Sequence, residues 1–103
     1  MRKSDFETIK ENGQFKSFTN FSISYLDRKL NEKARIGIII SKKISSKAVM
    51  RNRVKRLIRE ILRKNSECVK SGFDYVILAK SGIIHQSFAK LDIELTEALK
   101  TIL

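Results

Sequence analysis

The chain has 103 residues, of which 42% are hydrophobic, and its 22 basic and 11 acidic residues give a formal net charge of +11. A chain of this length builds one hydrophobic core, so we expect a single domain over residues 1–103, and its composition excludes wholesale disorder. No apolar run approaches membrane-spanning length, the first residues lack the apolar segment of a secretion signal, and the single Cys68 has no disulfide partner, so we expect a soluble, cytoplasmic protein.

The N-terminal residues predict a short helix. Ser4 and Glu7 have the spacing of a capping box, in which the serine begins the helix and the glutamate folds back onto it. Phe6 and Ile9 would face inward from this helix, and Gly13 is a natural end for it.

Two strands are predicted next. Residues 19–25 alternate between apolar and polar side chains, which is typical of a half-buried strand, with Phe21, Ile23 and Tyr25 on the inner face. Residues 27–33 are polar and predict a loop. Residues 35–41 are apolar on both faces, as expected for a strand in the middle of a sheet.

The C-terminal part predicts another strand and another helix. After a polar connector at residues 65–72, residues 73–79 again form a strand that is apolar on both faces. Residues 87–103 predict an amphipathic helix, because their apolar members follow helical spacing: Phe88, Leu91, Leu95, Ala98, Leu99 and Ile102.

The stretch at residues 41–64 carries most of the excess charge. Its ten basic residues and one acid, Glu60, give a net charge of +9 out of +11. Apolar residues recur in it with helical period and predict one buried face: Met50, Val54, Leu57, Ile58, Ile61 and Leu62. At about 100° per residue, the opposite face consists of Asn52, Lys55, Arg56, Arg59 and Arg63, with Arg51 and Arg53 at its borders.

This helix stands between two predicted strands, residues 35–41 and residues 73–79. A strand, a long helix and a second strand form a βαβ unit, in which the strands are parallel and the helix covers one face of the sheet.

The cationic face of the helix indicates a polyanionic partner. Like charges three or four residues apart destabilise an isolated helix, and only Glu60 is available to offset them, whereas a merely solvated face usually mixes both signs. Guanidinium groups bind phosphate through a planar set of donors, and Asn52 can reach a base edge or a 2′-hydroxyl. Nucleic acid is therefore the first expectation and an anionic membrane the second.

The sequence lacks the pattern of a catalytic or metal site. The single histidine, His85, is expected to be a surface or capping residue, and Cys68 a lone thiol. No cluster of His, Cys, Asp and Glu has metal-ligand spacing, and the four glycines are scattered rather than gathered in a phosphate loop. We therefore predict that the chain has no catalytic side chains and no metal site of its own.

Residues 42–60 carry a resemblance to a known family. Lys42 and Lys43 follow a predicted strand, and the helix then reads Arg51-Asn52-Arg53 followed by VKRLIRE. This arrangement resembles the protein subunit of bacterial ribonuclease P, whose signature is an Arg-Asn-Arg motif on a basic helix after a strand that ends in Lys-Lys. The match is close over residues 35–63 and extends over nearly the whole chain.

The resemblance implies an α/β (α+β) sandwich with a mixed four-stranded sheet and three helices. It therefore adds a short strand near residues 15–18, which the sequence pattern alone does not predict. It also implies a left-handed strand–helix–strand crossover, although such crossovers are right-handed in about 98% of cases.

The resemblance also implies that the chain assists a reaction that it does not catalyse. In the family, a large RNA subunit, with Mg²⁺ bound mainly by that RNA, acts as an endonuclease that removes the 5′ leader from precursor tRNA. The protein binds both RNAs and has no obligate protein partner and no membrane. Carried over by position, its RNA-binding residues are Lys42, Lys43, Arg51, Asn52, Arg53, Lys55, Arg56, Arg59 and Arg63.

A cleft for the single-stranded leader is a further implication of the resemblance. It lies between the first helix, the sheet and the basic helix, and Phe6 and Phe21 are its expected aromatic residues, able to stack on unpaired bases. Lys10 stands where relatives often have a second aromatic, and Ser24 where some have a tyrosine. We therefore expect leader contacts that are more electrostatic and less stacked than in such relatives.

Three other functions are compatible with a basic helix. A binder of structured RNA, such as a ribosomal protein, would share the charge pattern. Sequencing of the bound RNA would distinguish such a protein from a ribonuclease P protein subunit. A helix-turn-helix DNA reader is disfavoured because the basic helix stands between two strands. A membrane-surface helix is disfavoured because its apolar face is needed to cover the sheet.

Overall fold

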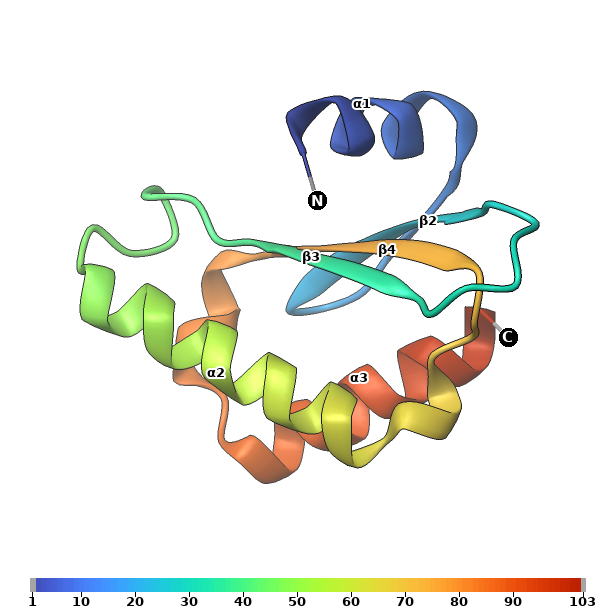
Figure 1. The fold of residues 1–103 in the computed structure, drawn as a ribbon. Helices are drawn as coiled ribbons and strands as arrows, with labels where there is room; N and C mark the ends of the chain where they lie inside the picture. Colours follow the sequence, from blue (N-terminus) through green and yellow to red (C-terminus); the bar gives the residue numbers. More distant parts are fainter. Residues whose placement is uncertain (1, 103) are drawn as a thin grey trace.

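The computed structural model describes residues 2–102 as a four-stranded sheet between two layers of helices (Figure 1). Helix α1 lies on one face of the sheet, and α2 and α3 lie on the other. The elements in chain order are α1 (Lys3–Asn12), β1 (Gln14–Ser17), β2 (Phe21–Asp27), β3 (Arg35–Ile39), α2 (Ala48–Lys64), η1 (Ser66–Cys68), β4 (Phe73–Ala79), η2 (Ser81–His85) and α3 (Phe88–Ile102), where η marks a short 3-10 helix.

These elements confirm the predicted sandwich of three α-helices on a mixed four-stranded sheet, including the short extra strand, β1. Leu103, which the sequence places at the end of the last helix, lies outside the described residues. None of the helices in residues 2–102 combines the length and the apolar character needed to cross a membrane.

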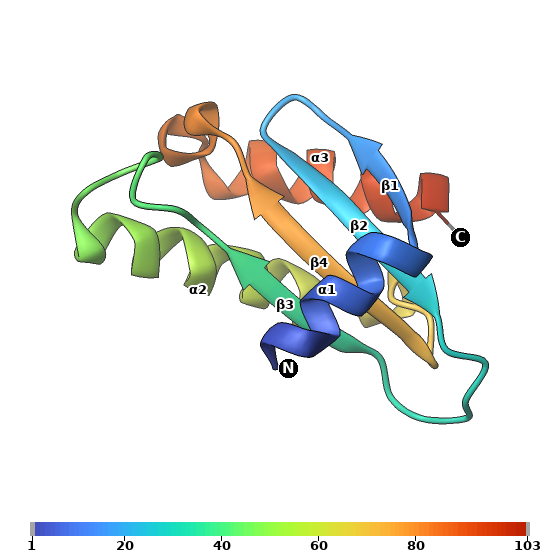
Figure 2. The same cartoon turned by 90° about the horizontal axis from the view of Figure 1, so that it is seen from above.

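The strand order is β1-β2-β4-β3. Strand β2 pairs antiparallel with β1 and β4, whereas β3 pairs parallel with β4, as predicted for the two strands of the βαβ unit. Seen from the α1 side with β3 and β4 running upward, β3 lies to the left of β4, and α2 passes beneath the sheet (Figure 2). The crossover is therefore left-handed, as the family resemblance implied and against the general preference.

The prediction that residues 35–41 form a strand in the middle of the sheet is wrong. Strand β3 ends at Ile39 and lies at the edge, where it pairs only with β4 among the described strands. Ile38 faces the α2 side and Ile39 the α1 side, so both faces of the strand carry apolar contacts. Apolar side chains on both faces of a strand indicate that both faces are covered by other elements. They do not indicate whether a further strand is hydrogen-bonded along the strand's edge.

The main hydrophobic core lies between the sheet and the pair of helices α2 and α3. The sheet contributes the odd-numbered residues of β2 and β4, which face this side: Phe21, Ile23, Tyr25, Tyr75 and Ile77. The helices contribute the apolar residues that helical spacing predicts, among them Val54, Ile58, Ile61, Leu91, Leu95 and Leu99. Packing on this face fixes the rotation of α2 about its axis, and with it the direction of the cationic side chains.

Helix α1 begins earlier than predicted. Ser4 is not its N-cap, because the helix starts at Lys3 and the backbone N–H of Arg2 donates to the Asp5 carboxylate at 2.7 Å. Asp5, two residues before Glu7, thus accepts the hydrogen bond from the N-cap backbone N–H that was expected of Glu7.

Gly13 ends α1 as predicted, with its N–H donating to the carbonyl oxygen of Ile9 at 2.8 Å. A Cβ at this position would lie 2.4 Å from the carbonyl oxygen of Tyr25. Glycine therefore allows the end of α1 to approach the backbone of β2 directly.

Strand β2 begins at Phe21 rather than at residue 19, because residues 19–20 form the turn from β1. The backbone N–H and the side-chain amide of Asn20 both donate to the Glu94 carboxylate, each at 3.2 Å. These two bonds fix the turn to α3.

Candidate nucleic-acid interface

Helix α2 presents the two faces that the sequence predicts. Val54, Ile58 and Ile61 are at most 1% exposed against the sheet and α3. On the opposite side Asn52, Arg53, Arg56, Arg59 and Arg63 are exposed, and Lys55 is half-buried. The structure thus places most of the predicted RNA-binding residues together on one helix.

Within the described part of the chain, the exposed cations of this face of α2 are not paired with acids. Among residues 2–102, the ion pairs that involve α2 are limited to Lys64 with Asp92, at 3.4 Å. Lys55, Arg56 and Arg59, together with Val49 and Asn52, line a shallow concavity of about 450 Å³. A phosphate that enters this concavity would meet cationic donors and an amide at once.

Lys42 and Lys43 lie on the loop between β3 and α2, and both are exposed. Arg51, at the start of α2, is half-buried and holds this loop, because its Nη1 donates to the carbonyl oxygen of Ser45 at 2.8 Å. A guanidinium has five N–H donors, so this bond leaves others for an outside partner.

A second concavity, of about 270 Å³, lies on the opposite face of the sheet, and we call it the α1 groove. Its lining residues are Phe6, Lys10, Phe15, Ser24, Ile39, Val76 and Leu78. Phe6 therefore lies where the predicted cleft requires it, beside Lys10 and Ser24. None of the lining residues belongs to α2, so the basic helix does not form a wall of this groove as the resemblance implied.

The prediction that Phe21 lines the cleft is wrong. Its side chain is 1% exposed and belongs to the core beneath the sheet. Side chains alternate between the two faces of a strand, so Phe21, Ile23 and Tyr25 face α2 and α3, whereas Ser24 faces the α1 groove.

Phe15 is the groove aromatic that sequence reasoning missed. It is 62% exposed and stands opposite Ser24 in the register of β1 with β2. The available signal was the alternation of Gln14, Phe15, Lys16 and Ser17, which places Phe15 with Ser17 on one face of a short strand and makes Phe15 its only apolar residue.

A buried carboxylate ties α1 to the sheet beside this groove. Asp74 of β4 is 2% exposed and accepts two hydrogen bonds from Arg35 of β3. Arg35 also lies 3.5 Å from the Asp5 carboxylate of α1, and Arg28 lies 3.7 Å from Asp74. The hydrogen bond to Asp74 raises the pKa of the Arg35 guanidinium, which stays charged throughout.

The described residues offer no ligand set for a resident metal ion. Within residues 2–102, no three side chains of His, Cys, Asp or Glu gather closely enough to hold one. Cys68 is buried in the core, and His85 is exposed at the end of η2.

Comparison with known proteins gives a consistent result. A family model described as Ribonuclease P matches residues 1–103. The ribonuclease P protein component of Lactobacillus delbrueckii subsp. bulgaricus is 40% identical over 76 residues, which make up 74% of this chain but only 63% of that protein. The corresponding component of Bacillus cereus is 31% identical over 99 residues, which cover 96% of this chain and 85% of that protein.

Solved structures show the same fold. The ribonuclease P protein from Thermotoga maritima matches with a TM-score of 0.87 and 28% identity, over 96% of this chain and 92% of that one. The Staphylococcus aureus protein matches with a TM-score of 0.89 and 25% identity, over 99% and 92% of the two chains. The family match along the whole sequence, together with these relatives, shows that the chain belongs to the Ribonuclease P protein family.

Proposed function

We propose that the chain is the protein component of a ribonuclease P ribonucleoprotein and that it acts by binding two RNAs. The catalytic RNA binds the cationic face of α2, and the 5′ leader of precursor tRNA lies in the α1 groove. Removal of the leader is carried out by the RNA subunit. The observation that carries this proposal is the row of exposed cations on α2. Within residues 2–102, the only cation of α2 that forms an ion pair with an acid is Lys64, which contacts Asp92.

The α2 face suits a folded RNA for electrostatic reasons. Arg56, Arg59 and Lys55 project from a helix whose other side is packed in the core, so their backbone positions are fixed before the RNA arrives. Each phosphate that they neutralise releases counterions, which makes the affinity strong and dependent on salt. Lys42, Lys43 and Arg53 extend the same charge beyond the concavity.

The α1 groove suits a single strand. Phe6 and Phe15 offer rings on which unpaired bases can stack, and Lys10 supplies a cation for the backbone between them. The remaining lining residues, Ile39, Val76 and Leu78, give an apolar floor. Such a groove binds nucleotides with little regard to sequence, as a protein that serves many precursors requires.

Mg²⁺ enters this proposal through the RNA. The ion supports cleavage of the phosphodiester bond from sites on the RNA subunit. The protein's contribution is to hold the precursor against that RNA, which reduces the Mg²⁺ concentration needed for tight binding.

Reconstitution tests the proposal. The full chain is combined with the RNA subunit from the same organism, at a Mg²⁺ concentration where the RNA alone cleaves slowly, and the rate of leader removal and the Kd of the precursor are measured. We expect the rate to rise and the Kd to fall when the chain is added. A chain that changes neither quantity would contradict the proposal.

A matched pair of double variants locates the effect. Arg56→Ala with Arg59→Ala should reduce the stimulation, whereas Lys90→Ala with Lys100→Ala removes the same charge from exposed positions of α3 and should leave it intact. Sequencing of the RNA that co-purifies with the chain then separates this function from general binding of structured RNA. Recovery of ribosomal RNA in place of the ribonuclease P RNA would favour the alternative.

A further inference from the structure

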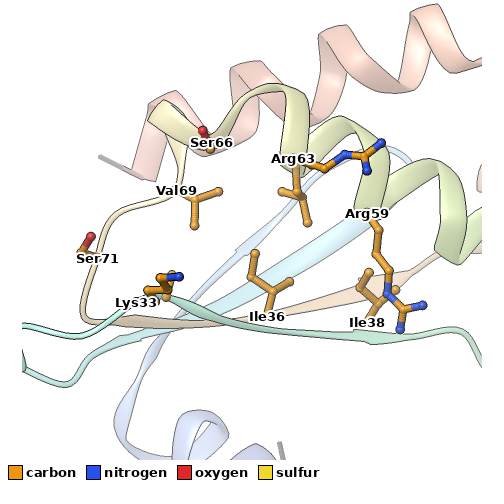
Figure 3. Close-up of a pocket in the computed structure, with 10 residues that line it drawn as sticks. Lys33, Ile36, Ile38, Arg59, Arg63, Ser66, Val69 and Ser71 are labelled. Atoms are coloured by element: carbon orange, nitrogen blue, oxygen red, sulfur yellow. The ribbon is translucent and has the colours of Figure 1, made fainter.

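A third concavity lies between the edge strand β3 and helix α2, and we call it the edge groove. Its volume is about 410 Å³, and Figure 3 shows most of its lining side chains. It is separate from the α1 groove, since the two lie on opposite faces of the sheet and share no lining residue. Its aliphatic residues take no part in the binding of RNA proposed for the cationic face of α2 or for the α1 groove.

The floor of the edge groove is aliphatic. Ile36 and Ile38 project from β3 toward α2, and Val69 faces them from the segment after α2 (Figure 3). Ile36 and Ile38 remain half-exposed, because β3 is an edge strand and no further strand among the described elements extends the sheet to cover them. Ala34 and Leu62 complete an apolar surface large enough for one planar ring with its sugar.

The rim of the edge groove is cationic. Arg59 reaches from α2 down to β3 beside Ile38, Lys33 lies at the other end, and Arg63 stands at the border (Figure 3). None of the ten residues that line the groove is acidic, and Ser66 and Ser71 add hydroxyl groups. An apolar floor with cations and hydroxyls at its border is complementary to a base that carries a phosphate.

Arg59 connects the edge groove to the proposed RNA surface. It lines both the edge groove and the concavity on the outer face of α2. An RNA backbone bound along α2 through Arg56 and Arg59 therefore passes the mouth of the edge groove. A base that is not paired in that RNA can turn into the groove while its phosphate stays on the arginines.

We propose that the edge groove binds one unpaired nucleobase of the RNA that lies along α2. The ring packs on Ile36, Ile38 and Val69, and the adjoining phosphate is held by Arg59, with Arg63 and Lys33 as further cations. A duplex cannot enter, because its bases are stacked inside the helix, so the occupant is a bulged or single-stranded nucleotide. This inference rests on the proposed function, since it requires RNA along α2.

Methyl NMR of the full chain tests the proposal directly. Isoleucine and valine methyl groups are labelled, and the chain is titrated with a short single-stranded oligouridylate and, separately, with tripolyphosphate as a probe of phosphate alone. Ile36 and Ile38 report on the edge groove, whereas Ile39 and Val76 report on the α1 groove. We expect oligouridylate to shift the Ile36 and Ile38 signals and tripolyphosphate to leave them nearly unchanged.

A filled groove provides the second arm. Ala34 is half-buried in the groove, and Ala34→Phe adds a ring where the base is expected; Ala89→Phe makes the same change at an exposed position of α3. Ala34→Phe should weaken oligouridylate binding at Ile36 and Ile38 about tenfold, equivalent to the loss of roughly 1.4 kcal/mol, and should leave tripolyphosphate binding unchanged. Ala89→Phe should have no effect. If Ala34→Phe does not fold, Ser71→Trp places a ring over the groove from an exposed position.

Each outcome decides a different point. Shifts at Ile39 and Val76 alone would place single-stranded RNA only in the α1 groove and would overturn this proposal while leaving the proposed function intact. Equal shifts of Ile36 and Ile38 with tripolyphosphate would reduce the site to an anion site and would also overturn it. A chain that stimulates leader removal but binds no oligouridylate would overturn this proposal alone, whereas a chain that fails in both experiments would overturn both.

Discussion

Arg35 donates two hydrogen bonds to Asp74, from Nε at 2.9 Å and from Nη2 at 2.7 Å, across directly paired positions of β3 and β4. The pair explains how an acidic residue is tolerated in an otherwise apolar, buried strand. Through the contact of Arg35 with Asp5, it also connects the parallel strands to α1. This connection, together with the buried side chain of Ile9, positions α1 over the sheet and so contributes to the shape of the α1 groove.

Replacement of Asp74 tests the connection. Asp74→Asn removes the charge that Arg35 faces and should reduce the free energy of unfolding by about 2 kcal/mol, less than for a fully buried pair because Arg35 is partly exposed. Denaturation in urea measures the loss. Glu67→Gln, at an exposed position of η1, removes the same charge and should change stability by less than about 0.5 kcal/mol. Equal effects of the two variants would contradict the structural role of Asp74.

Asp5 should make the stability of α1 dependent on pH. The hydrogen bond from the backbone N–H of Arg2, with a further contribution from Arg35, lowers the pKa of the Asp5 carboxyl below its ordinary value of 3.8. The ionised form is thus favoured in the folded protein, so its stabilisation is complete above pH 3.8 and is lost as the pH falls through the lowered pKa. Asp5→Asn should be less stable than the parent chain at neutral pH, and the difference should shrink toward zero in acid. A difference that does not change with pH would show that Asp5 acts through its shape rather than its charge.

Single arginines of α2 should each contribute to the salt dependence of RNA binding. Arg56→Ala or Arg59→Ala should weaken binding and reduce the slope of log K against log salt by about one phosphate contact each. Filter binding or fluorescence anisotropy over a range of salt concentrations measures the slope. Lys100→Ala, on the exposed part of α3, is the charge-matched control and should leave the slope unchanged. An unchanged slope in the arginine variants would mean that these cations point into solvent in the complex.

Two phenylalanines should behave in opposite ways. Phe15→Ala removes a ring that is 62% exposed in the α1 groove, so it should weaken binding of precursor tRNA but not of mature tRNA, with little loss of stability. Phe21→Ala removes a ring that is 1% exposed and should cost about 3–5 kcal/mol in unfolding free energy. Paired measurements of melting and of precursor affinity separate the two roles. A Phe21 variant that melts like the parent would be incompatible with the core described above.

Helix α2 gives a matched pair for packing. Ile58 is 1% exposed beneath the sheet, and Ile58→Ala should reduce stability by about 2–5 kcal/mol because it leaves a cavity. Val49 is 75% exposed on the same helix, and Val49→Ala should change stability by less than about 0.5 kcal/mol. Thermal unfolding followed by circular dichroism distinguishes the two. Similar losses at both positions would mean that α2 is rotated from the orientation seen here.

The two faces of α2 were predictable because helical period alone decides which residues share a side. The same holds for α3 and for the apolar face of β2. The edge position of β3 was not predictable, because the pattern of its side chains describes its faces and not its backbone edge. The contact of Arg35 with Asp74 was missed for a related reason: the two residues are far apart in sequence and meet only through the parallel pairing of β3 with β4.

The groove aromatics show where local pattern fails at a site. Strand alternation correctly placed Phe21 on the same face as Ile23 and Tyr25, and this grouping alone predicts that the Phe21 side chain lies in the core. The assignment of Phe21 to the cleft came instead from resemblance and ignored the alternation. Phe15 was overlooked because β1 spans only Gln14–Ser17, which is too short for its pattern to stand out from a loop.

The strand order has a consequence for synthesis on the ribosome. Among the described strands, only β1 and β2 are paired partners joined by a short turn, and β4 must insert between β2 and β3 to complete the sheet. Until residues 73–79 have been made, α2 has no finished sheet on which to bury its apolar face. The apolar face of α2 therefore stays uncovered from the synthesis of α2 until β4 has been made, and contacts this distant in sequence form late. The surface proposed to bind RNA is thus held in its final orientation only after the last strand has been added, although its residues are translated before that strand.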